Sequence, residues 1–194
     1  NDKGDLANWS FSYISEKGFD CIKTVRTPAG GLETLTYDPT GHAFPKGSGR
    51  EPLPRVASHV IDPRNNQPKQ ALHNSYPKDE HNVLGNGLTV PWAEDGLDSL
   101  YLHLGTYTYG STEELREGTK VLRSVERQFN QFHLQTLEKT TRNGHEHSIT
   151  TQYDHDPKKY FADQVASCQL PRLSTTKWAR GTDNRSETEG FTYT

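Results

Sequence analysis

Hydrophobic and polar positions alternate along much of this chain, and the alternation predicts β-strands rather than helices. The clearest region is 121–153, where two stretches rich in Thr, Val, Leu and aromatic side chains meet at Asn143-Gly144. Asn-Gly between such stretches indicates a two-residue hairpin turn, because a type I′ turn needs positive φ at both central residues. We therefore expect a long β-ribbon in which residues 132–142 pair with residues 145–153.

A two-residue turn also fixes which residues of the ribbon face each other. On one face the expected pairs are Arg142 with His145, Thr140 with His147, Glu138 with Ile149, Thr136 with Thr151 and Leu134 with Tyr153. On the other face they are Gln135 with Gln152 and His133 with Asp154. The tip of the ribbon is therefore polar and expected to project from the body of the protein, whereas its base is more apolar and expected to pack on it.

Other alternating or apolar stretches predict further strands at 9–15, 19–27, 32–37, 53–61, 70–76, 97–109, 120–129 and 174–178. Turn residues separate several of them, at 28–31 and 38–41. The sequence Ser111-Thr112-Glu113-Glu114 fits a capping box, so we expect one short helix that ends at Gly118. The chain is thus predicted to be mainly β, an antiparallel sheet with long hairpins and little helix.

Composition narrows the class of protein. The 194 residues suit one domain, and the hydrophobic fraction of 30% is low for a globular protein. Nine Tyr, seven Phe and three Trp argue against disorder, and a net charge of −3 argues against a general nucleic-acid binder. No apolar run is long enough to span a membrane. The N-terminal segment has neither a starting Met nor a signal peptide, so we expect a processed or trimmed chain.

Histidines on the ribbon suggest two kinds of site, a zinc site and an acid–base pair. His145, His147 and Glu138 share one face of the ribbon, and two imidazoles with one carboxylate can bind zinc. Strand-borne His pairs without Cys or HExxH spacing are not typical zinc sites, so we expect an ordinary polar hairpin tip without metal or other cofactor. His133 with Asp154 suggests an acid–base pair, but no nucleophile motif accompanies it, so a structural cross-strand pair is the better interpretation.

Aromatic side chains and cysteines give two further expectations. A carbohydrate-binding surface is one use for Trp92, Tyr101, Tyr107, Tyr109 and Trp178. In β-proteins such residues more often form the core and cross-strand contacts. Cys21 and Cys168 are far apart in sequence and make no disulfide framework, so we expect two unpaired thiols.

Several short motifs occur in an order that resembles a known family. Leu32–Phe44 contains Tyr37-Asp38-x-x-Gly41, which is similar to the core of a YD (RHS) repeat. The later motifs are Leu53-Pro54-Arg55-Val56, Gln67-Pro68, Tyr76, Leu84-Gly85 with Gly87, Tyr107-x-Tyr109-Gly110, Arg127-Gln-Phe-Asn130-x-Phe132-His133-Leu134, Gln169-Leu170-Pro171 and Thr175-Thr-Lys-Trp178. Over residues 53–178 this order resembles the middle to C-terminal region of the B component of bacterial insecticidal toxin complexes, the Tc toxins. SpvB-type virulence proteins are similar over parts of it.

The resemblance implies a function that the residues alone do not. In that family YD-repeat strands form a β-shell, closed with the C-component partner, that encapsulates a cytotoxic polypeptide before delivery into host cells. The chain is then a non-catalytic virulence factor, secreted or extracellular as part of a bacterial toxin complex. Its partners are the rest of the large toxin protein, the C component and the cargo. Only one YD element is present, and no catalytic residue of the family maps onto this chain.

The same interpretation divides the chain into three segments. Residues 1–52 form a YD-repeat-like β-segment, 53–180 the B-component-like β-region, and 181–194 a linker-like tail. Two other functions stay open: a metal- or glycan-binding β-module, and a hydrolase with a site centred on His133.

Overall fold

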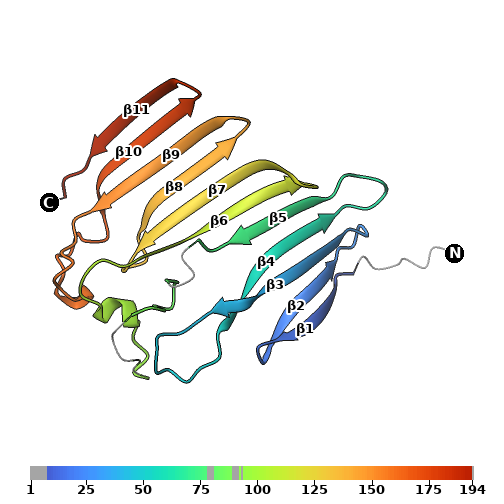
Figure 1. Cartoon of the computed structure of the whole chain (residues 1–194), viewed down its shortest axis with the longest axis horizontal. Coiled ribbons are helices and arrows are strands. Elements are labelled where there is room, and N and C mark those ends of the chain that lie inside the picture. The colour runs from blue at the N-terminus through green and yellow to red at the C-terminus, as the bar shows by residue number, and fades with distance from the viewer. Residues whose placement is uncertain (1–7, 78–80, 89–91, 93, 194) are drawn as a thin grey trace.

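The computed structural model describes residues 8–77, 81–88, 92 and 94–193, and these residues form one antiparallel sheet of eleven strands. The order of the strands in the sheet is their order in the chain, so every strand pairs with its sequence neighbours, and the first and last strands form opposite edges (Figure 1). The strands are β1 Ser10–Glu16, β2 Phe19–Arg26, β3 Leu32–His42, β4 Leu53–Asp62, β5 Gln70–Ser75, β6 Thr108–Glu117, β7 Lys120–Asn130, β8 Gln135–Arg142, β9 His145–Tyr153, β10 Pro171–Arg180 and β11 Asp183–Gly190. Two 3-10 helices are described, η1 Ser99–Leu102 and η2 Phe161–Asp163.

The expected mainly β fold with little helix is confirmed, and so is the hairpin at Asn143-Gly144. Asn143 has a φ of 51° and Gly144 a φ of 74°, the signs that a type I′ turn requires. The register places Arg142 opposite His145, Thr140 opposite His147 and Glu138 opposite Ile149, as predicted. Because each strand follows its neighbour through a short local connection in most of the sheet, turn chemistry decides much of the pairing.

The prediction of a buried strand over residues 97–109 is wrong. Residues 99–102 form helix η1, and only Thr108 and Tyr109 belong to a strand, β6. Leu100 and Tyr107 are buried all the same, at 0% and 2% exposure, because this segment packs against the sheet instead of pairing with it. Leu97, Leu102 and Leu104 of the same run are 62%, 37% and 46% exposed, so the apolar run predicted neither a strand nor burial along its whole length.

The short helix expected after Ser111 is also absent, because residues 111–117 belong to β6. Glu113 pairs with Arg123 of β7 through a 3.1 Å contact, and Glu114 pairs with Arg116. Cross-strand pairing with β5 on one side and β7 on the other outweighs the local capping signal.

Two further segments differ from the prediction. Residues 183–190, within the tail expected to be linker-like, form strand β11, which pairs with β10 over its whole length. Residues 38–41, predicted as a turn, lie inside β3, where the register against β4 shifts between Asp38 and His42. Gly41 has a φ of 69° there, so the turn signal produced a bulge rather than a chain reversal.

The two faces of the sheet differ in chemistry. Following the cross-strand partners from β1 to β11 places these hydrophobic residues on one face, which we call the apolar face: Phe11, Tyr13, Val25, Leu35, Ile61, Leu72, Leu115, Val125, Ile149 and Trp178. The opposite face, which we call the hydroxyl face, carries Ser and Thr side chains bonded across strands, such as Ser12 with Thr24 at 2.6 Å and Thr175 with Thr188 at 3.1 Å. The described residues include no second sheet packed on either face.

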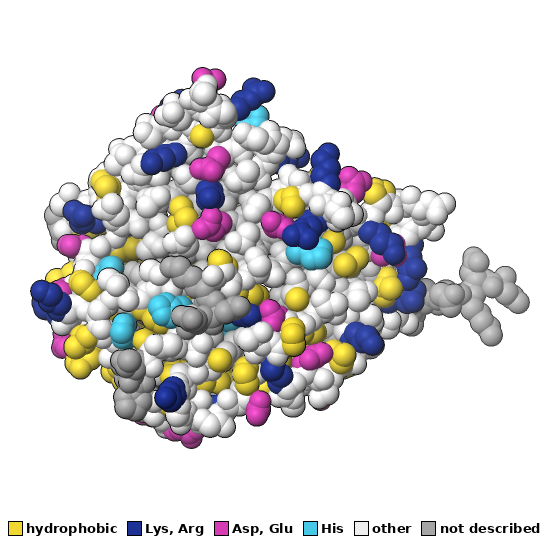
Figure 2. Space-filling view, viewed as in Figure 1, with side chains coloured by type: hydrophobic (Ala, Val, Ile, Leu, Met, Phe, Trp, Pro, Cys, Tyr) yellow, Lys and Arg dark blue, Asp and Glu magenta, His cyan; other side chains and the backbone are white. Residues whose placement is uncertain are grey.

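A layer of loops covers one end of the apolar face. Helices η1 and η2 lie in this layer, below the strand ends of β6–β9 in the view of Figure 1. The core forms where Leu88, Leu100 and Tyr107 pack with Tyr109 and Phe129 of the sheet. In Figure 2 hydrophobic side chains are more frequent over the lower half of the molecule than over β8–β11 at the top. The core is therefore small and confined to the end of the sheet under the loops.

Candidate functional site

The turn between β7 and β8 positions the first candidate site, which centres on His133. The Oδ1 atom of Asn130 accepts hydrogen bonds from the backbone N–H of Phe132 at 2.9 Å and of Leu134 at 3.1 Å. The N–H of His133 donates to the carbonyl of Asn130 at 3.1 Å. These bonds hold His133 at a φ of 59°, a left-handed conformation that residues with a Cβ seldom adopt. The imidazole is thereby aimed into the loop layer.

Both ring nitrogens of His133 are engaged. Nε2 lies 2.5 Å from Oδ2 of Asp98, and Nδ1 lies 2.6 Å from the hydroxyl oxygen of Tyr109. Asp98 is also the N-cap of η1, because its Oδ1 accepts from the N–H of Leu100 at 2.8 Å. The expected pairing of His133 with Asp154 is therefore wrong: the imidazole turns toward the loop layer, and Asp154 is exposed. We call Asp98, His133 and Tyr109 the His133 cluster.

The electrostatics of the cluster favour a charged Asp98 and a neutral Tyr109. Burial raises the pKa of Asp98, but the hydrogen bonds from His133 and from the Leu100 N–H, with the charge of His133, outweigh it and lower that pKa. Burial, followed by the charge of Asp98, raises the pKa of the Tyr109 hydroxyl well above its usual value. A phenol that is this hard to ionise is a poor nucleophile and a poor base.

The hydrogen bonds described for His133 involve only Asp98 and Tyr109, so no Ser, Thr or Cys side chain is activated by it. The cluster connects η1, the β7–β8 turn and strand β6, so its hydrogen bonds attach the loop layer to the sheet. In the sequence, Asp98 precedes Ser99 and is a residue type typical of a helix N-cap. Nothing in the sequence indicated that it would contact His133.

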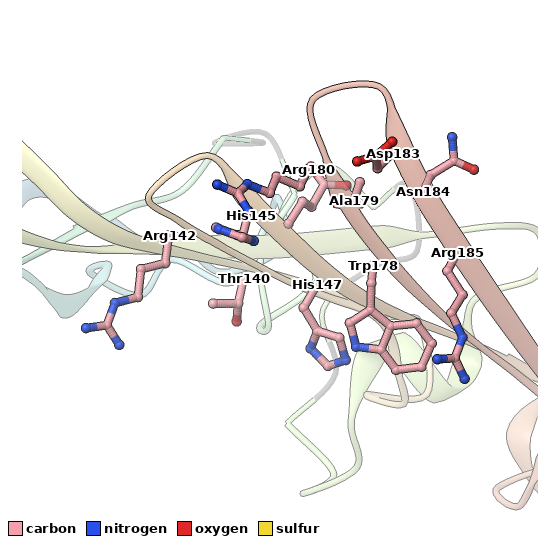
Figure 3. Close-up of a pocket in the computed structure, with 11 residues that line it drawn as sticks. Thr140, Arg142, His145, His147, Trp178, Ala179, Arg180, Asp183, Asn184 and Arg185 are labelled. Atoms are coloured by element: carbon pink, nitrogen blue, oxygen red, sulfur yellow. The ribbon is translucent and has the colours of Figure 1, made fainter.

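The second candidate site lies at the far end of the ribbon, at the tips of hairpins β8–β9 and β10–β11. The register aligns two cross-strand rows on the apolar face. The outer row is Arg142, His145, Arg180 and Asp183, and the inner row is Thr140, His147, Trp178 and Arg185. Figure 3 shows Thr140, His147, Trp178 and Arg185 pointing the same way from four successive strands. These residues line an open groove of about 410 Å³, which we call the tip groove.

Trp178 forms the floor of the tip groove. Its ring centroid lies 5.7 Å from that of His147, and the guanidinium carbon of Arg185 lies 5.3 Å from the same ring. Arg185 also pairs with Glu187 of its own strand. The hairpin predicted from the sequence correctly placed Thr140, Arg142, His145 and His147 on one face of its tip. The contribution of Asp183 and Arg185 was missed because residues 181–194 were interpreted as a linker.

The three candidate metal ligands do not converge. His145 and His147 are exposed residues of β9 in the tip groove, whereas Glu138 binds the Nε atom of Arg127 at 3.0 Å. Across the described ranges, no group of three or more His, Cys, Asp or Glu side chains is arranged to hold a metal ion.

The five aromatic residues considered for carbohydrate binding are dispersed. Tyr107 and Tyr109 are buried in the core, and Tyr101 stacks on Phe161 at 4.1 Å. Trp92 packs edge-on against Phe44 at 5.3 Å, and Trp178 lies in the tip groove on β10. No shared surface results from them.

Both cysteines are free, as expected, with Cys168 buried in the loop layer and Cys21 on β2. Burial raises the pKa of both thiols, which makes them less reactive. No helix in the described part of the chain is long and apolar enough to cross a membrane.

Comparison of the chain with protein-family models, with curated proteins and with solved structures finds no match.

Proposed function

We propose that this chain is a non-catalytic section of the wall of a large β-shell, which encapsulates a cytotoxic polypeptide for delivery into host cells. The shell is of the kind formed by the B component of the Tc toxins with its C-component partner, and it is secreted as part of a toxin complex. One observation carries the proposal: the described residues form a single layer of eleven strands in chain order, in which the edge strands β1 and β11 each pair on one side only.

A single layer suits a wall better than it suits an independent domain. Independent antiparallel sheets usually bury one face against a second layer. Here only the loop end of the apolar face is covered, and side chains such as Phe11 and Tyr13 are 51% and 61% exposed. A wall section also needs edges at which neighbouring sections can pair, and within the described residues β1 and β11 each have one edge without a paired strand.

The motifs behind the resemblance occupy positions where they hold the sheet together. The hydroxyl of Tyr37 donates to the carbonyl of Ile22 at 2.7 Å, which ties β3 to β2. Asp38 binds the buried guanidinium of Arg55 at 3.0 Å, and Arg127 binds Glu138 at 3.0 Å. These are architectural roles, consistent with a wall and with the absence of an activated nucleophile at His133.

The decisive experiment is electron cryomicroscopy of the full natural gene product, purified with its C-component partner. The expected result is a hollow particle in which this sequence forms a one-layer part of the wall around a polypeptide. A natural product that is little longer than this chain and forms no particle would overturn the proposal.

A second measurement uses the chain itself. With both edges open, the isolated chain is expected to self-associate or to be only marginally stable, which size-exclusion chromatography and thermal melting measure. A strictly monomeric chain with a Tm above about 90 °C would contradict a wall section.

The alternative, a metal- or glycan-binding β-module, has one observation in its favour: His145, His147 and Trp178 share the tip groove. Elemental analysis after dialysis and a glycan-binding screen distinguish this binding module from a section of a shell wall. Stoichiometric zinc, or a glycan whose binding is lost in Trp178→Ala, would favour the module.

A further inference from the structure

The tip groove contains two arginines without an acidic partner. Arg142 of β8 and Arg180 of β10 make no ion pair and no side-chain hydrogen bond with any residue in the ranges 8–77, 81–88, 92 and 94–193. By contrast, Arg185 in the next row is paired with Glu187. Asp183 is the neighbour of Arg180 in the outer row, yet no ion pair joins them. Two guanidinium groups are therefore available to a ligand, and guanidinium binds carboxylate in a bidentate fork.

The distance between the backbone positions of Arg142 and Arg180 indicates how long a ligand must be to contact both. They belong to one cross-strand row and are separated by β9, where His145 stands between them. Two strand spacings amount to about 10 Å. The Cα atoms of the two arginines are thus about 10 Å apart, close to the repeat of side chains three residues apart in a polyproline-II peptide, so such a peptide can present one carboxylate to each arginine.

Trp178 supplies an apolar surface beside the two charges. It lies in the inner row, next to His147, and is 38% exposed. Burying an aromatic side chain is favourable, and a partly exposed Trp flanked by Arg is typical of the centre of a binding site. The ligand thus combines negative charge with at least one apolar group.

The shape of the groove selects an elongated ligand. At about 410 Å³ it has the volume of a ligand site, but it opens along the surface of two hairpin tips and does not enclose a small molecule. One acidic residue, Asp183, lines it in the same row as the arginines, and the whole chain has a net charge of −3. Those charges oppose a dense polyanion such as nucleic acid and favour a ligand with a few separated carboxylates.

We propose that the tip groove binds an extended acidic peptide segment, with carboxylates at Arg142 and Arg180 and an apolar side chain against Trp178. This proposal stands independently of the shell, because it rests on the geometry of the hairpin tips alone.

The test uses a reporter that the chain already contains. The three tryptophans are Trp9, Trp92 and Trp178, so Trp9→Phe with Trp92→Phe leaves Trp178 as the only tryptophan. The probe is an eight-residue, proline-rich peptide without tryptophan, with two Glu three positions apart and Leu between them. Its titration is expected to change Trp178 fluorescence saturably, and a peptide with Gln in place of both Glu is expected to have no effect. Isothermal calorimetry on the unsubstituted chain repeats the measurement without the Phe substitutions.

The variants separate a specific site from general charge attraction. Arg142→Gln with Arg180→Gln is expected to weaken binding at least about tenfold, since each lost charge-assisted contact is worth more than the free energy of one decade. Lys177→Gln is the matched control, because Lys177 precedes Trp178 on β10 and its side chain lies on the hydroxyl face. It is expected to change affinity less than about twofold.

Three results would overturn the proposal. One is the absence of saturable binding in calorimetry up to about 1 mM peptide, the weakest affinity of interest. Another is an equal loss of affinity in Lys177→Gln and in the double arginine variant. The third is a sialylated oligosaccharide that binds more tightly than the peptide and displaces it, which would assign the groove to an acidic sugar instead.

Discussion

The Nε2 atom of His133 lies 2.5 Å from the Oδ2 atom of Asp98, and this contact joins residues 35 positions apart. Asp98 caps η1 in the loop layer, and His133 lies in the turn between β7 and β8. The contact therefore holds the loop layer on the apolar face of the sheet, over the small core. It acts together with that core and with contacts such as the hydrogen bond from Gln131 to the carbonyl of Gly105 at 3.2 Å.

The pH dependence of stability is expected to follow Asp98. Its folded pKa is lowered, so its contribution is fully present above its unfolded pKa of about 3.9 and is lost as pH falls through the lower folded pKa. Asp98→Asn should reduce the free energy of unfolding at pH 7 by about 2 kcal/mol and flatten its dependence between pH 5 and pH 2. Urea denaturation at several pH values measures both.

The control for this variant is Asp95→Asn. Asp95 makes the same kind of Asx contact, with the N–H of Leu97 at 2.9 Å, but it is exposed and has no histidine partner. A loss of stability in Asp95→Asn equal to that in Asp98→Asn would contradict the role given to His133.

Tyr107→Phe is expected to release residues 81–88 from the core. The Tyr107 hydroxyl accepts from the N–H of Asn82 at 2.8 Å and lies within donating distance of the carbonyls of Asn82 and Asn86. Burial also raises the pKa of this hydroxyl to about 12, so it stays neutral. Losing it leaves the buried N–H of Asn82 unsatisfied, at a cost of about 1–3 kcal/mol. Limited proteolysis should then cut within 81–88 sooner.

Tyr101→Phe is the matched change for Tyr107→Phe. Tyr101 stacks on Phe161 through its ring, and no hydrogen bond of its hydroxyl is described. We expect a change in unfolding free energy below about 0.5 kcal/mol. Equal proteolysis of the two variants would show that the hydroxyl of Tyr107 is not what holds the segment.

Two ion pairs of equal length should differ greatly in their effect on stability. Arg55 binds Asp38 at 3.0 Å with its own side chain 3% exposed, whereas Arg50 binds Glu94 at 3.0 Å with 50% exposure. Asp38→Ala removes the carboxylate that contacts the buried guanidinium of Arg55 and should cost about 2–3 kcal/mol. Arg50→Ala should cost less than about 1 kcal/mol. Chemical denaturation measures both, and similar losses would contradict the assignment of burial as the deciding factor.

Gly110→Ala is expected to disrupt the pairing of β6 with β7. A Cβ at this position would lie 2.4 Å from the carbonyl oxygen of Arg127, which is backbone and has no room to move without shifting the strand. The cost should be about 1–3 kcal/mol, as for overpacking elsewhere.

Gly190→Ala, at the end of β11, is the comparison for Gly110→Ala. Its nearest neighbour would be a methyl group of Leu173 at 3.9 Å, an ordinary contact. Thermal melting should show a clear decrease in Tm for Gly110→Ala and almost none for Gly190→Ala. A tolerated Gly110→Ala would mean that β6 and β7 are not packed as closely as described.

The sequence alone determined the features of this protein that depend on neighbours along the chain. The turn at Asn143-Gly144 set the register of β8 with β9, since a two-residue turn leaves one pairing that keeps the apolar positions on one face. The same reasoning located most of the other strands, and it placed His145 and His147 on one face of the hairpin tip. The function proposed from the family resemblance stays a prediction.

Only the tertiary structure decided what pairs or packs beyond a hairpin. The segments 111–117 and 183–190 became strands because the sheet offered them a partner edge, although their local sequences favoured a cap and a linker. Most of the run at 97–109 became an irregular segment, in which Leu100 and Tyr107 pack against the end of the sheet while Leu97 and Leu104 stay exposed. His133 met Asp98 and not Asp154 because its left-handed backbone aims the ring into the loop layer. Such contacts depend on the free energy gained when segments far apart in the sequence pack together. A local pattern of residues does not predict that free energy.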